Sequence, residues 1–322
     1  MQPAGTLEQL EQAARIVYEA MPPTPQYVWP LLCERLDCEV WIKHENHSPT
    51  GAFKVRGGLV YFRDLSEQSR RPAGVISATR GNHGISVGFA ARRYGIATSL
   101  VVPHGNSVEK NAAMRALGVE LIEHGEDFQT AREHAARLAT QRGLVMVPSF
   151  HPLLVQGVAT YSLEFFRAVP NLDVAYVPIG LGSGICGMIA ARQVLGLKAQ
   201  IVGVVSEQAP AYALSFDQHR PVEHGVSTRL ADGMACRTPE PEALEILWRE
   251  CARIVRVTDD EVADAMRLMF TATHNAAEGA GAAGLAAAMK ERSVLRGKKI
   301  GLVLSGANVD HDVFSQVLAR AA

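Results

Sequence analysis

The sequence predicts an α/β protein with two lobes, in which twisted and mostly parallel β-sheets are flanked by helices. Short β-branched runs alternate with segments of helical apolar spacing, which is typical of parallel sheets covered by helices. The chain has 322 residues. A single core stops growing near this size, so we expect two domains, or one large unit with an embedded smaller lobe. Hydrophobic residues make up 48% of the chain, enough for a sizeable core.

Seven short apolar runs are predicted to be the strands of these sheets. They are rich in Val, Ile and Leu and are separated by loops and helical segments. The predicted strands are 74–78, 98–103, 119–124, 144–148, 174–179, 201–206 and 299–306. A further short strand, 40–43, precedes the first of the motifs described below.

Helices are predicted between these strands by apolar spacing and capping signals. Segments 108–118 and 128–143 have helical spacing and end at glycines that suit a C-cap, Gly118 and Gly143. Thr258 with Glu261 three residues later forms a capping-box start. The Ala/Gly run at 276–288 is typical of a tightly packed helix whose small side chains let backbones approach closely.

Composition and charge exclude several classes of function. The formal net charge is -1, which gives no electrostatic support for nucleic acid as a partner. The N-terminus has no basic start followed by an apolar run, and no stretch reaches the roughly 18 apolar residues of a membrane span, so we expect a soluble cytosolic protein without a membrane contact. The five cysteines form no CxxC pair, and HExxH is absent, so no metal site is predicted.

The first motif is SPTGAFKVRGG at 48–58, which follows the strand at 40–43. Here one lysine, Lys54, lies among small residues and beside Phe53. A desolvated setting disfavours the charged form of a lysine, and only the neutral amine can act covalently. Lys54 is therefore a candidate covalent amine, and the alternative is an ordinary surface lysine.

The second motif is SATRGNHG at 77–84, between a predicted strand and a predicted helix. A glycine-flanked loop that opens a helix presents unpaired backbone N–H groups, which bind a carboxylate or a phosphate well. Asn82 adds a side-chain donor. An ordinary capped turn is the alternative.

The third motif is PIGLGSGICG at 178–187, again between a strand and a helix. Its glycines let the backbone approach an oxyanion closely, and Ser183 can donate its hydroxyl, so the loop is a candidate phosphate cradle. The spacing of Gly182, Gly184 and Gly187, with Glu207 after the next strand, also matches a dinucleotide fingerprint. Taken alone, this motif favours a nicotinamide enzyme.

The fourth motif is LSGANVD at 304–310, after the last predicted strand. The neutral hydroxyl of Ser305 could meet a ring nitrogen of a bound cofactor without giving it a full proton. A turn serine is the alternative.

Together, in this order, the four motifs resemble those of the fold type II pyridoxal-phosphate enzymes, the threonine/serine dehydratase and serine racemase group. The phrases HPLLVQGVAT from His151 and LADGMACRTP from Leu230 also resemble the family, and the match covers nearly the whole chain. The resemblance implies that Lys54 forms a Schiff base with pyridoxal 5′-phosphate, with Phe53 beside it. It implies that a carboxylate-binding loop holds the substrate, with Asn82 also touching the 3′ oxygen of the cofactor; this loop comprises Thr79, Arg80, Gly81, Asn82 and His83. The cofactor-binding residues further implied are Gly180, Leu181, Gly182, Ser183 and Gly184 for the phosphate, Gly233 beside the ring and Ser305 at the ring nitrogen.

The resemblance also implies the architecture and the reaction. We expect a large cofactor-binding lobe, 1–49 plus 151–322, and a small mobile lobe, 50–150, that closes over the substrate. The expected activity is that of a lyase that converts a small β-hydroxy amino acid such as threonine or serine to a 2-oxo acid and ammonia. Members of the family are commonly dimers. The chain ends soon after the catalytic core, so a regulatory domain is not expected.

Departures from the family pattern leave alternatives open. Ala52 stands where the family usually has serine, and Ala213 stands at the second acidic position of the family's cation site, so a divalent cation is not expected. Arg80 stands where racemases of the family carry a serine that serves as proton donor, which favours elimination over racemisation. We interpret Arg80 as an ion-paired residue at the helix start. The alternative is a contact to a second anionic group, as in 3-hydroxyaspartate. A nicotinamide oxidoreductase and a catalytically silent binding protein on the same fold are the remaining alternatives.

Overall fold

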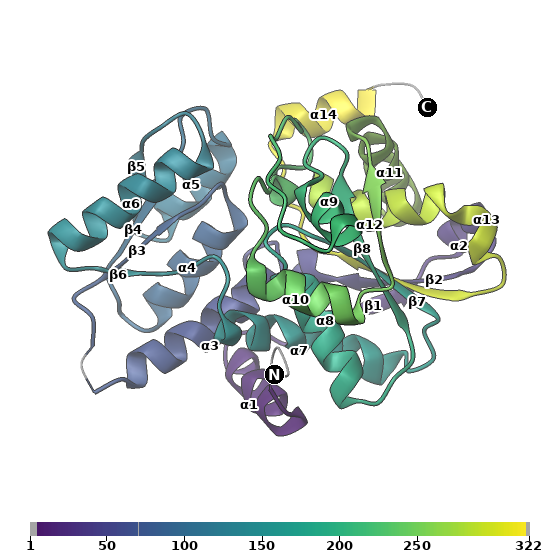
Figure 1. Cartoon of the computed structure of the whole chain (residues 1–322), viewed down its shortest axis with the longest axis horizontal. Helices are drawn as coiled ribbons and strands as arrows, with labels where there is room; N and C mark the ends of the chain where they lie inside the picture. The colour runs from purple at the N-terminus through teal and green to yellow at the C-terminus, as the bar shows by residue number, and fades with distance from the viewer. Residues whose placement is uncertain (1–4, 70, 320–322) are drawn as a thin grey trace.

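The computed structural model describes residues 5–69 and 71–319, and it contains two β-sheets in separate parts of the molecule (Figure 1). The larger sheet has six strands in the order β1 (Gln26–Val28), β2 (Glu39–His44), β10 (Lys299–Leu304), β7 (Val174–Pro178), β8 (Gln200–Ser206) and β9 (Arg253–Val257). The smaller sheet has four strands in the order β5 (Glu120–Glu123), β4 (Thr98–Val102), β3 (Val75–Ala78) and β6 (Val145–Met146).

The strands confirm the predicted α/β class. Every strand pair in the two sheets is parallel except β1 with β2. All the predicted strands are present, but the sequence analysis missed β1 and β9. Both lie at an edge of the larger sheet, where Tyr27 is exposed and Arg253 and Arg256 interrupt the apolar run. Edge strands are covered on fewer sides, so their apolar signal is weak.

Helices cover both faces of the larger sheet. Alternate residues of β7 face opposite ways: Ala175 and Val177 join one apolar core, and Val174 and Tyr176 join the other. The first core is completed by α7 (Pro152–Ala168), α8 (Ser183–Val194), α9 (Ala211–Gln218) and α10 (Pro241–Glu250). The second is completed by α2 (Pro30–Leu36), α11 (Asp259–Thr273), α12 (Gly279–Lys290) and α13 (Arg292–Leu295), and α14 (His311–Ala319) packs on α11.

The smaller sheet is also covered on both faces. One face packs against α4 (Asn82–Arg93), α5 (Val108–Ala116) and the C-terminal part of α3 (Lys54–Glu67). The other packs against the alanines of α6 (Phe128–Arg142). Short 3-10 turns, η1 (Glu45–His47) and η2 (Asp232–Met234), lie in loops of the larger part.

The predicted helix signals are confirmed. Gly143 follows α6 in the left-handed conformation, and Gly118 also has positive φ just after α5. Thr258 and Glu261 form both bonds of a capping box at the start of α11. The Ala/Gly run forms α12, and a Cβ on Gly281 would lie closer than 3.0 Å to the carbonyl oxygen of Gly306. The small side chains therefore bring α12 against the loop that follows β10.

A close crossing of α3 and α7 joins the two parts of the molecule. A Cβ on Gly157 would lie closer than 3.0 Å to the carbonyl oxygen of Arg56, and a Cβ on Gly57 would lie 2.8 Å from that of Leu154. At its other side α3 packs on α1 (Leu7–Tyr18). The crossing fixes the position of α3, whose first residue is Lys54.

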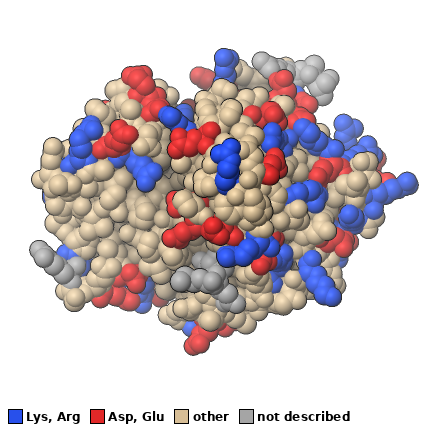
Figure 2. Space-filling view, viewed as in Figure 1, with Lys and Arg blue, Asp and Glu red and all other residues tan. Residues whose placement is uncertain are grey.

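The surface carries mixed charge. Basic and acidic side chains are interspersed on the face shown in Figure 2, in keeping with the net charge of -1. Among residues 5–69 and 71–319, the structure contains no helix with the length and apolar character that crossing a membrane requires.

Substituting Gly157 by Ala should destabilise the fold, because the added methyl meets backbone atoms of α3 that cannot move aside like a side chain. We expect a loss of about 1–3 kcal/mol in the free energy of unfolding, measured by denaturant titration. Gly225→Ala is the matched control, because a Cβ at Gly225 meets nothing within 4 Å. Equal stability of the two variants would contradict the crossing described here.

Candidate active site

The first and fourth motifs lie side by side. Residues 51–53 run antiparallel to residues 305–307, and the backbone N–H of Phe53 donates to the carbonyl oxygen of Ser305 at 3.0 Å. Ser305 is buried, and its hydroxyl makes no hydrogen bond to a described residue. The pairing therefore places a free neutral hydroxyl next to the segment that carries Lys54.

Lys54 is the first residue of α3, and it is the one lysine whose surroundings match the predicted covalent amine. Its Nζ lies 4.6 Å from the centroid of the Phe53 ring. Within the described part of the chain, Nζ has neither a hydrogen bond nor an ion pair. Burial lowers the pKa of Lys54 to about 8, although the carboxylate of Glu278 acts in the opposite direction. A lysine with this pKa is partly neutral near physiological pH.

A buried ion cluster supports the start of α3. Arg56 is fully buried; its Nε lies 2.7 Å from Oε2 of Glu45, and its Nη1 lies 2.6 Å from Oε1 of Glu164. Lys43 pairs with the other oxygen of Glu164 at 2.5 Å. Breaking one member of such a cluster leaves an uncompensated buried charge, so the cluster fixes Arg56 and with it the backbone of Lys54. The sequence analysis did not find this cluster.

The second motif forms a tight loop between β3 and α4. Oγ1 of Thr79 accepts the backbone N–H groups of Gly81 at 3.0 Å and Gly84 at 2.9 Å. Asn82 and His83 are the first residues of α4, where backbone N–H groups have no acceptor within the helix. The loop thus ends at a helix N-terminus, which is the feature on which the predicted anion site depends.

His83 is neutral. Burial and, to a smaller extent, the charge of Lys54 lower the pKa of His83 to about 3. The hydroxyl of Ser77 donates to the carbonyl oxygen of Val147 at 2.9 Å, and Nε2 of His83 lies 3.2 Å from the same hydroxyl. Since that hydroxyl has only one hydrogen, Nε2 is the donor, and Nδ1 is the unprotonated nitrogen.

The interpretation of Arg80 as an ion-paired residue is wrong. Its side chain is exposed, and it forms no ion pair with any residue in 5–69 or 71–319. The physical reason is that the acids beside the loop are engaged elsewhere: Asp232 pairs with Lys110, and Glu278 with both Lys110 and Asn82. Arg80 is therefore an exposed cation that has no ion-pair partner among the described residues, next to the loop predicted to bind an anion.

The third motif opens α8, which begins at Ser183 directly after Gly182. Gly182 has a φ of 98°, a conformation that favours glycine. The hydroxyl of Tyr212 on α9 donates to the carbonyl oxygen of Leu181 at 3.0 Å, and this bond links the loop to α9. The result is a glycine-rich turn that leads into a helix N-terminus, the arrangement that suits a phosphate.

This turn lies against the other predicted residues. A Cβ on Gly184 would lie 3.6 Å from the ring of Phe53. A Cβ on Gly180 would lie closer than 3.0 Å to the carbonyl oxygen of Gly233. The glycine turn, Gly233 and the residue before Lys54 are thus brought together from distant parts of the sequence.

Two further residues of the site were missed by the sequence analysis. Glu278, the residue before α12, is 3% exposed, and its Oε1 accepts Nδ2 of Asn82 at 2.6 Å. Asn308 donates its Nδ2 to Oδ1 of Asn82 at 2.9 Å and to the carbonyl oxygen of Thr50 at 2.8 Å. Glu278 is the one acid in the Ala/Gly run at 276–288, and a charge in such a run was the signal that could have identified it.

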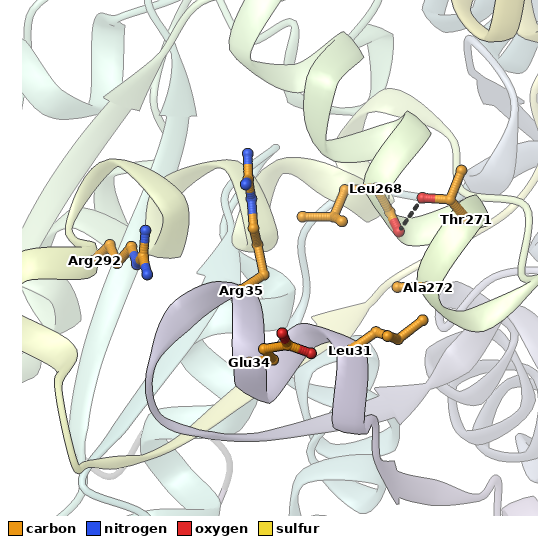
Figure 3. Close-up of a pocket in the computed structure, with 7 residues that line it drawn as sticks. All are labelled: Leu31, Glu34, Arg35, Leu268, Thr271, Ala272 and Arg292. Atoms are coloured by element: carbon orange, nitrogen blue, oxygen red, sulfur yellow. Dashed lines mark hydrogen bonds between the residues drawn. The ribbon is translucent and has the colours of Figure 1, made fainter.

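A surface hollow of about 390 Å³ lies elsewhere, between α2 and α11 (Figure 3). It is lined by Leu31, Glu34, Arg35, Leu268, Thr271, Ala272 and Arg292. None of the predicted site residues borders it. The clustering of chemical groups around Lys54 therefore marks the candidate site better than the size of a hollow does.

Comparisons with known proteins agree with the geometry. Residues 17–306 match the family described as "Pyridoxal-phosphate dependent enzyme". An L-threonine ammonia-lyase of Thermotoga maritima is 32% identical over 98% of this chain and 78% of its own length. A biosynthetic L-threonine dehydratase of Haemophilus influenzae is 31% identical to this chain. The match covers 94% of this chain and 60% of the length of that relative. Among solved structures, a pyridoxal 5′-phosphate-dependent aspartate racemase has 25% identity and a TM-score of 0.91, covering 97% of this chain and 98% of its own.

The reactivity of Lys54 should depend on pH with a midpoint near 8 in the cofactor-free protein. The neutral amine is the reactive form, so labelling by an amine reagent should rise with pH, and about one tenth of the amine is already neutral at pH 7 if its pKa is about 8. Peptide mass spectrometry after timed labelling measures this rate, and the peptide with the exposed Lys198 corrects for the reagent. A midpoint above pH 10 would show that burial does not control this lysine.

Proposed function

The chain belongs to the family of pyridoxal-phosphate dependent enzymes, and we propose that it converts a small β-hydroxy amino acid to a 2-oxo acid and ammonia, with L-threonine as the first candidate substrate. The family model shows the dependence on pyridoxal phosphate, and the relatives that are threonine ammonia-lyases and threonine dehydratases support a lyase. The observation that carries the proposal is that one partly neutral lysine, Lys54, lies where the segments of Asn82, Ser305 and the glycine turn meet. The family and this arrangement argue against the hypothesis that the glycine turn binds a dinucleotide.

The residues present fit the chemical groups of the cofactor. Residues 180–184, at the N-terminus of α8, suit the phosphate, since the cradle that they form is kept open by missing Cβ atoms. Lys54 suits the carbonyl carbon that an amine attacks. The free hydroxyl of Ser305 suits a ring nitrogen, and Asn82 can donate to the 3′ oxygen. Phe53 and Gly233 would border the ring.

We assign the catalytic steps to residues of this chain. When bound, the cofactor supplies the electron-withdrawing system that makes the α-hydrogen of a substrate acidic. Residues 79–83 hold the substrate carboxylate at the start of α4 through their backbone groups and Asn82, so the α-carboxylate does not require the side chain of Arg80. Lys54 takes the proton from Cα with its neutral amine. As a neutral partner, Ser305 would leave the ring nitrogen of a bound cofactor unprotonated, which would favour loss of the β-hydroxyl. The hydroxyl takes up a proton and leaves as water, and hydrolysis of the released enamine consumes one water and gives the 2-oxo acid and ammonia.

We also propose how the chain is divided. Residues 1–49 and 151–322 would form the large lobe that holds the cofactor, and residues 50–150 a small lobe that carries the loop 77–84. The pairing with residues 305–307 and the crossing with α7 attach residues 51–53 and the first turn of α3 to the large lobe. Closure would therefore move the smaller sheet and its helices about this attachment and exclude water while the α-proton is removed. The two separate sheets and the interlobe bond between Asn82 and Glu278 support this division.

The second candidate substrate is 3-hydroxyaspartate, and one observation favours it. Arg80 is exposed beside the anion loop and has no ion-pair partner among the residues that the structure describes. A guanidinium in this setting suits a second carboxylate. Racemisation is disfavoured, because Arg80 provides no hydroxyl that could deliver a proton to the opposite face of Cα.

The oligomeric state, location and partners are proposed from the family resemblance and the composition. We expect a homodimer in the cytoplasm with a small amino-acid substrate and no nucleic-acid or membrane partner. The net charge of -1 and the interspersed surface charges support the absence of a polyanion partner.

Replacing Lys54 by Ala should abolish the release of 2-oxo acid and ammonia, because the base at Cα and the attachment point of the cofactor are both lost. A loss of at least about 1,000-fold is expected for a residue with a covalent and an acid–base role. The assay measures both products from L- and D-serine, L- and D-threonine and 3-hydroxyaspartate. A change of optical rotation without oxo acid would instead identify a racemase.

Replacing Arg80 by Ala should separate the two candidate substrates. If Arg80 binds a second carboxylate, kcat/KM for 3-hydroxyaspartate should fall by about 10- to 100-fold, since a charge-assisted hydrogen bond is worth roughly 1.5–3 kcal/mol. The value for threonine should stay within about threefold, since a surface substitution without a substrate contact costs little. Equal losses for both substrates would rule out a second carboxylate as the ligand of Arg80.

A further inference from the structure

We propose that Glu278 is a positioning residue that holds the side-chain amide of Asn82 in one orientation, so that a single N–H of Asn82 is left to bind the cofactor. The inference rests on the proposed function, in which Asn82 donates to the 3′ oxygen. It adds Glu278 and Asn308 to the site as the residues that set the direction of this donor.

The hydrogen bonds of Asn82 determine the orientation. The amide has two N–H donors and one carbonyl acceptor. Oε1 of Glu278 can only accept, so the nitrogen of Asn82 must face it, at 2.6 Å. Nδ2 of Asn308 can only donate, so the oxygen of Asn82 must face it, at 2.9 Å. A flipped amide would place donor against donor and acceptor against acceptor, which excludes the other orientation.

One donor of Asn82 remains after this assignment. Glu278 takes the first N–H hydrogen, and Asn308 occupies a lone pair of the oxygen. Asn308 is itself fixed, because it also donates to the carbonyl oxygen of Thr50 at 2.8 Å. The second N–H of Asn82 is therefore available to a ligand acceptor, and the partners of the amide prevent it from rotating away.

The position of Glu278 explains why it can act across the two halves of the molecule. Glu278 precedes α12 and lies against Gly306, while Asn82 begins α4 of the smaller-sheet part. Its second oxygen, Oε2, lies 3.3 Å from Nζ of Lys110 on α5, and this oxygen has no hydrogen bond in the described residues. The ion pair keeps a carboxylate in place at a site where only 3% of the residue is exposed.

The charge of Glu278 also acts on Lys54. Burial raises the pKa of Glu278, and the ammonium of Lys110 opposes this shift. In turn the carboxylate raises the pKa of Lys54 against the effect of burial. Removing the charge should therefore lower the pKa of Lys54. A residue that served only for packing would not change this titration.

The test is a double-mutant cycle that measures the dissociation constant of pyridoxal phosphate by absorbance titration of the cofactor-free protein. Asn82→Ala and Glu278→Ala should each weaken binding by about tenfold, the worth of a hydrogen bond to a charged group. The double variant should be no weaker than the single ones, because Glu278 acts through Asn82. Glu278→Gln should recover part of the loss, since its carbonyl oxygen can still accept from Asn82.

Glu291→Gln is the matched control, because Glu291 is a paired carboxylate at the opposite end of α12. It should leave the dissociation constant and the pH midpoint of Lys54 labelling unchanged, whereas Glu278→Gln should lower that midpoint. If Glu278→Ala does not fold, Asn308→Ala replaces it in the same cycle. Additive losses in the double variant, or an unchanged midpoint in Glu278→Gln, would overturn the inference.

The outcomes also separate this inference from the proposed function. Borohydride reduction of the wild-type protein with pyridoxal phosphate should attach one pyridoxyl phosphate group to Lys54, a mass gain equal to the cofactor less one water and plus two hydrogens. If Lys54 is not modified, the proposed function itself fails. If Lys54 is modified and the cycle is additive, only the role of Glu278 fails.

Discussion

The pairing of residues 51–53 with residues 305–307 is the contact on which the rest of the site depends. Ala52 bridges Gly306, the N–H of Phe53 bonds to Ser305, and the N–H of Ala307 bonds to Gly51 at 2.9 Å. These are backbone contacts between segments about 250 residues apart, so they set position without relying on any flexible side chain. They attach the start of α3 to the carboxyl end of β10, where ligands bind in open α/β sheets.

Close packing then transmits this position to the other loops. Gly157 lets α7 touch the backbone of α3, and Gly281 lets α12 touch the loop after β10. Gly180 brings the glycine turn against Gly233. In each case a side chain would fill the space in which two backbone segments are in contact. Glycines far apart in the sequence therefore have the same effect, which is to allow close backbone packing around the site. Backbone atoms rather than flexible side chains therefore set the positions of the loops around Lys54.

The sequence predicts those parts of this structure that leave a local signal. The buried strands, the capping box of α11 and the four motifs are each contained in a few consecutive residues, so periodicity and composition reveal them. The prediction that Arg80 is ion-paired was wrong, because the pairing of a surface arginine depends on which acidic side chains lack another partner in the fold. Here Asp232 and Glu278 both pair with Lys110. Glu278 and Asn308 were missed for the same reason: their partners lie about 200 residues away. Site residues that act through polar contacts between distant parts of the chain can be identified only once the fold is known.

The electrostatics of the site follow from a balance of opposing requirements at Lys54. Burial promotes the neutral amine, which can attack a carbonyl carbon and take a proton. In a fully apolar setting nothing would oppose this effect of burial on the pKa of Lys54. The carboxylate of Glu278 restores part of the ammonium form, and its own charge is kept by Lys110, which Asp232 also pairs at 2.7 Å. The chain of alternating charges ends at Asp232, directly before Gly233. The same groups that act on the charge of Lys54 therefore also connect α5 of the smaller-sheet part to the loop that contains Gly233.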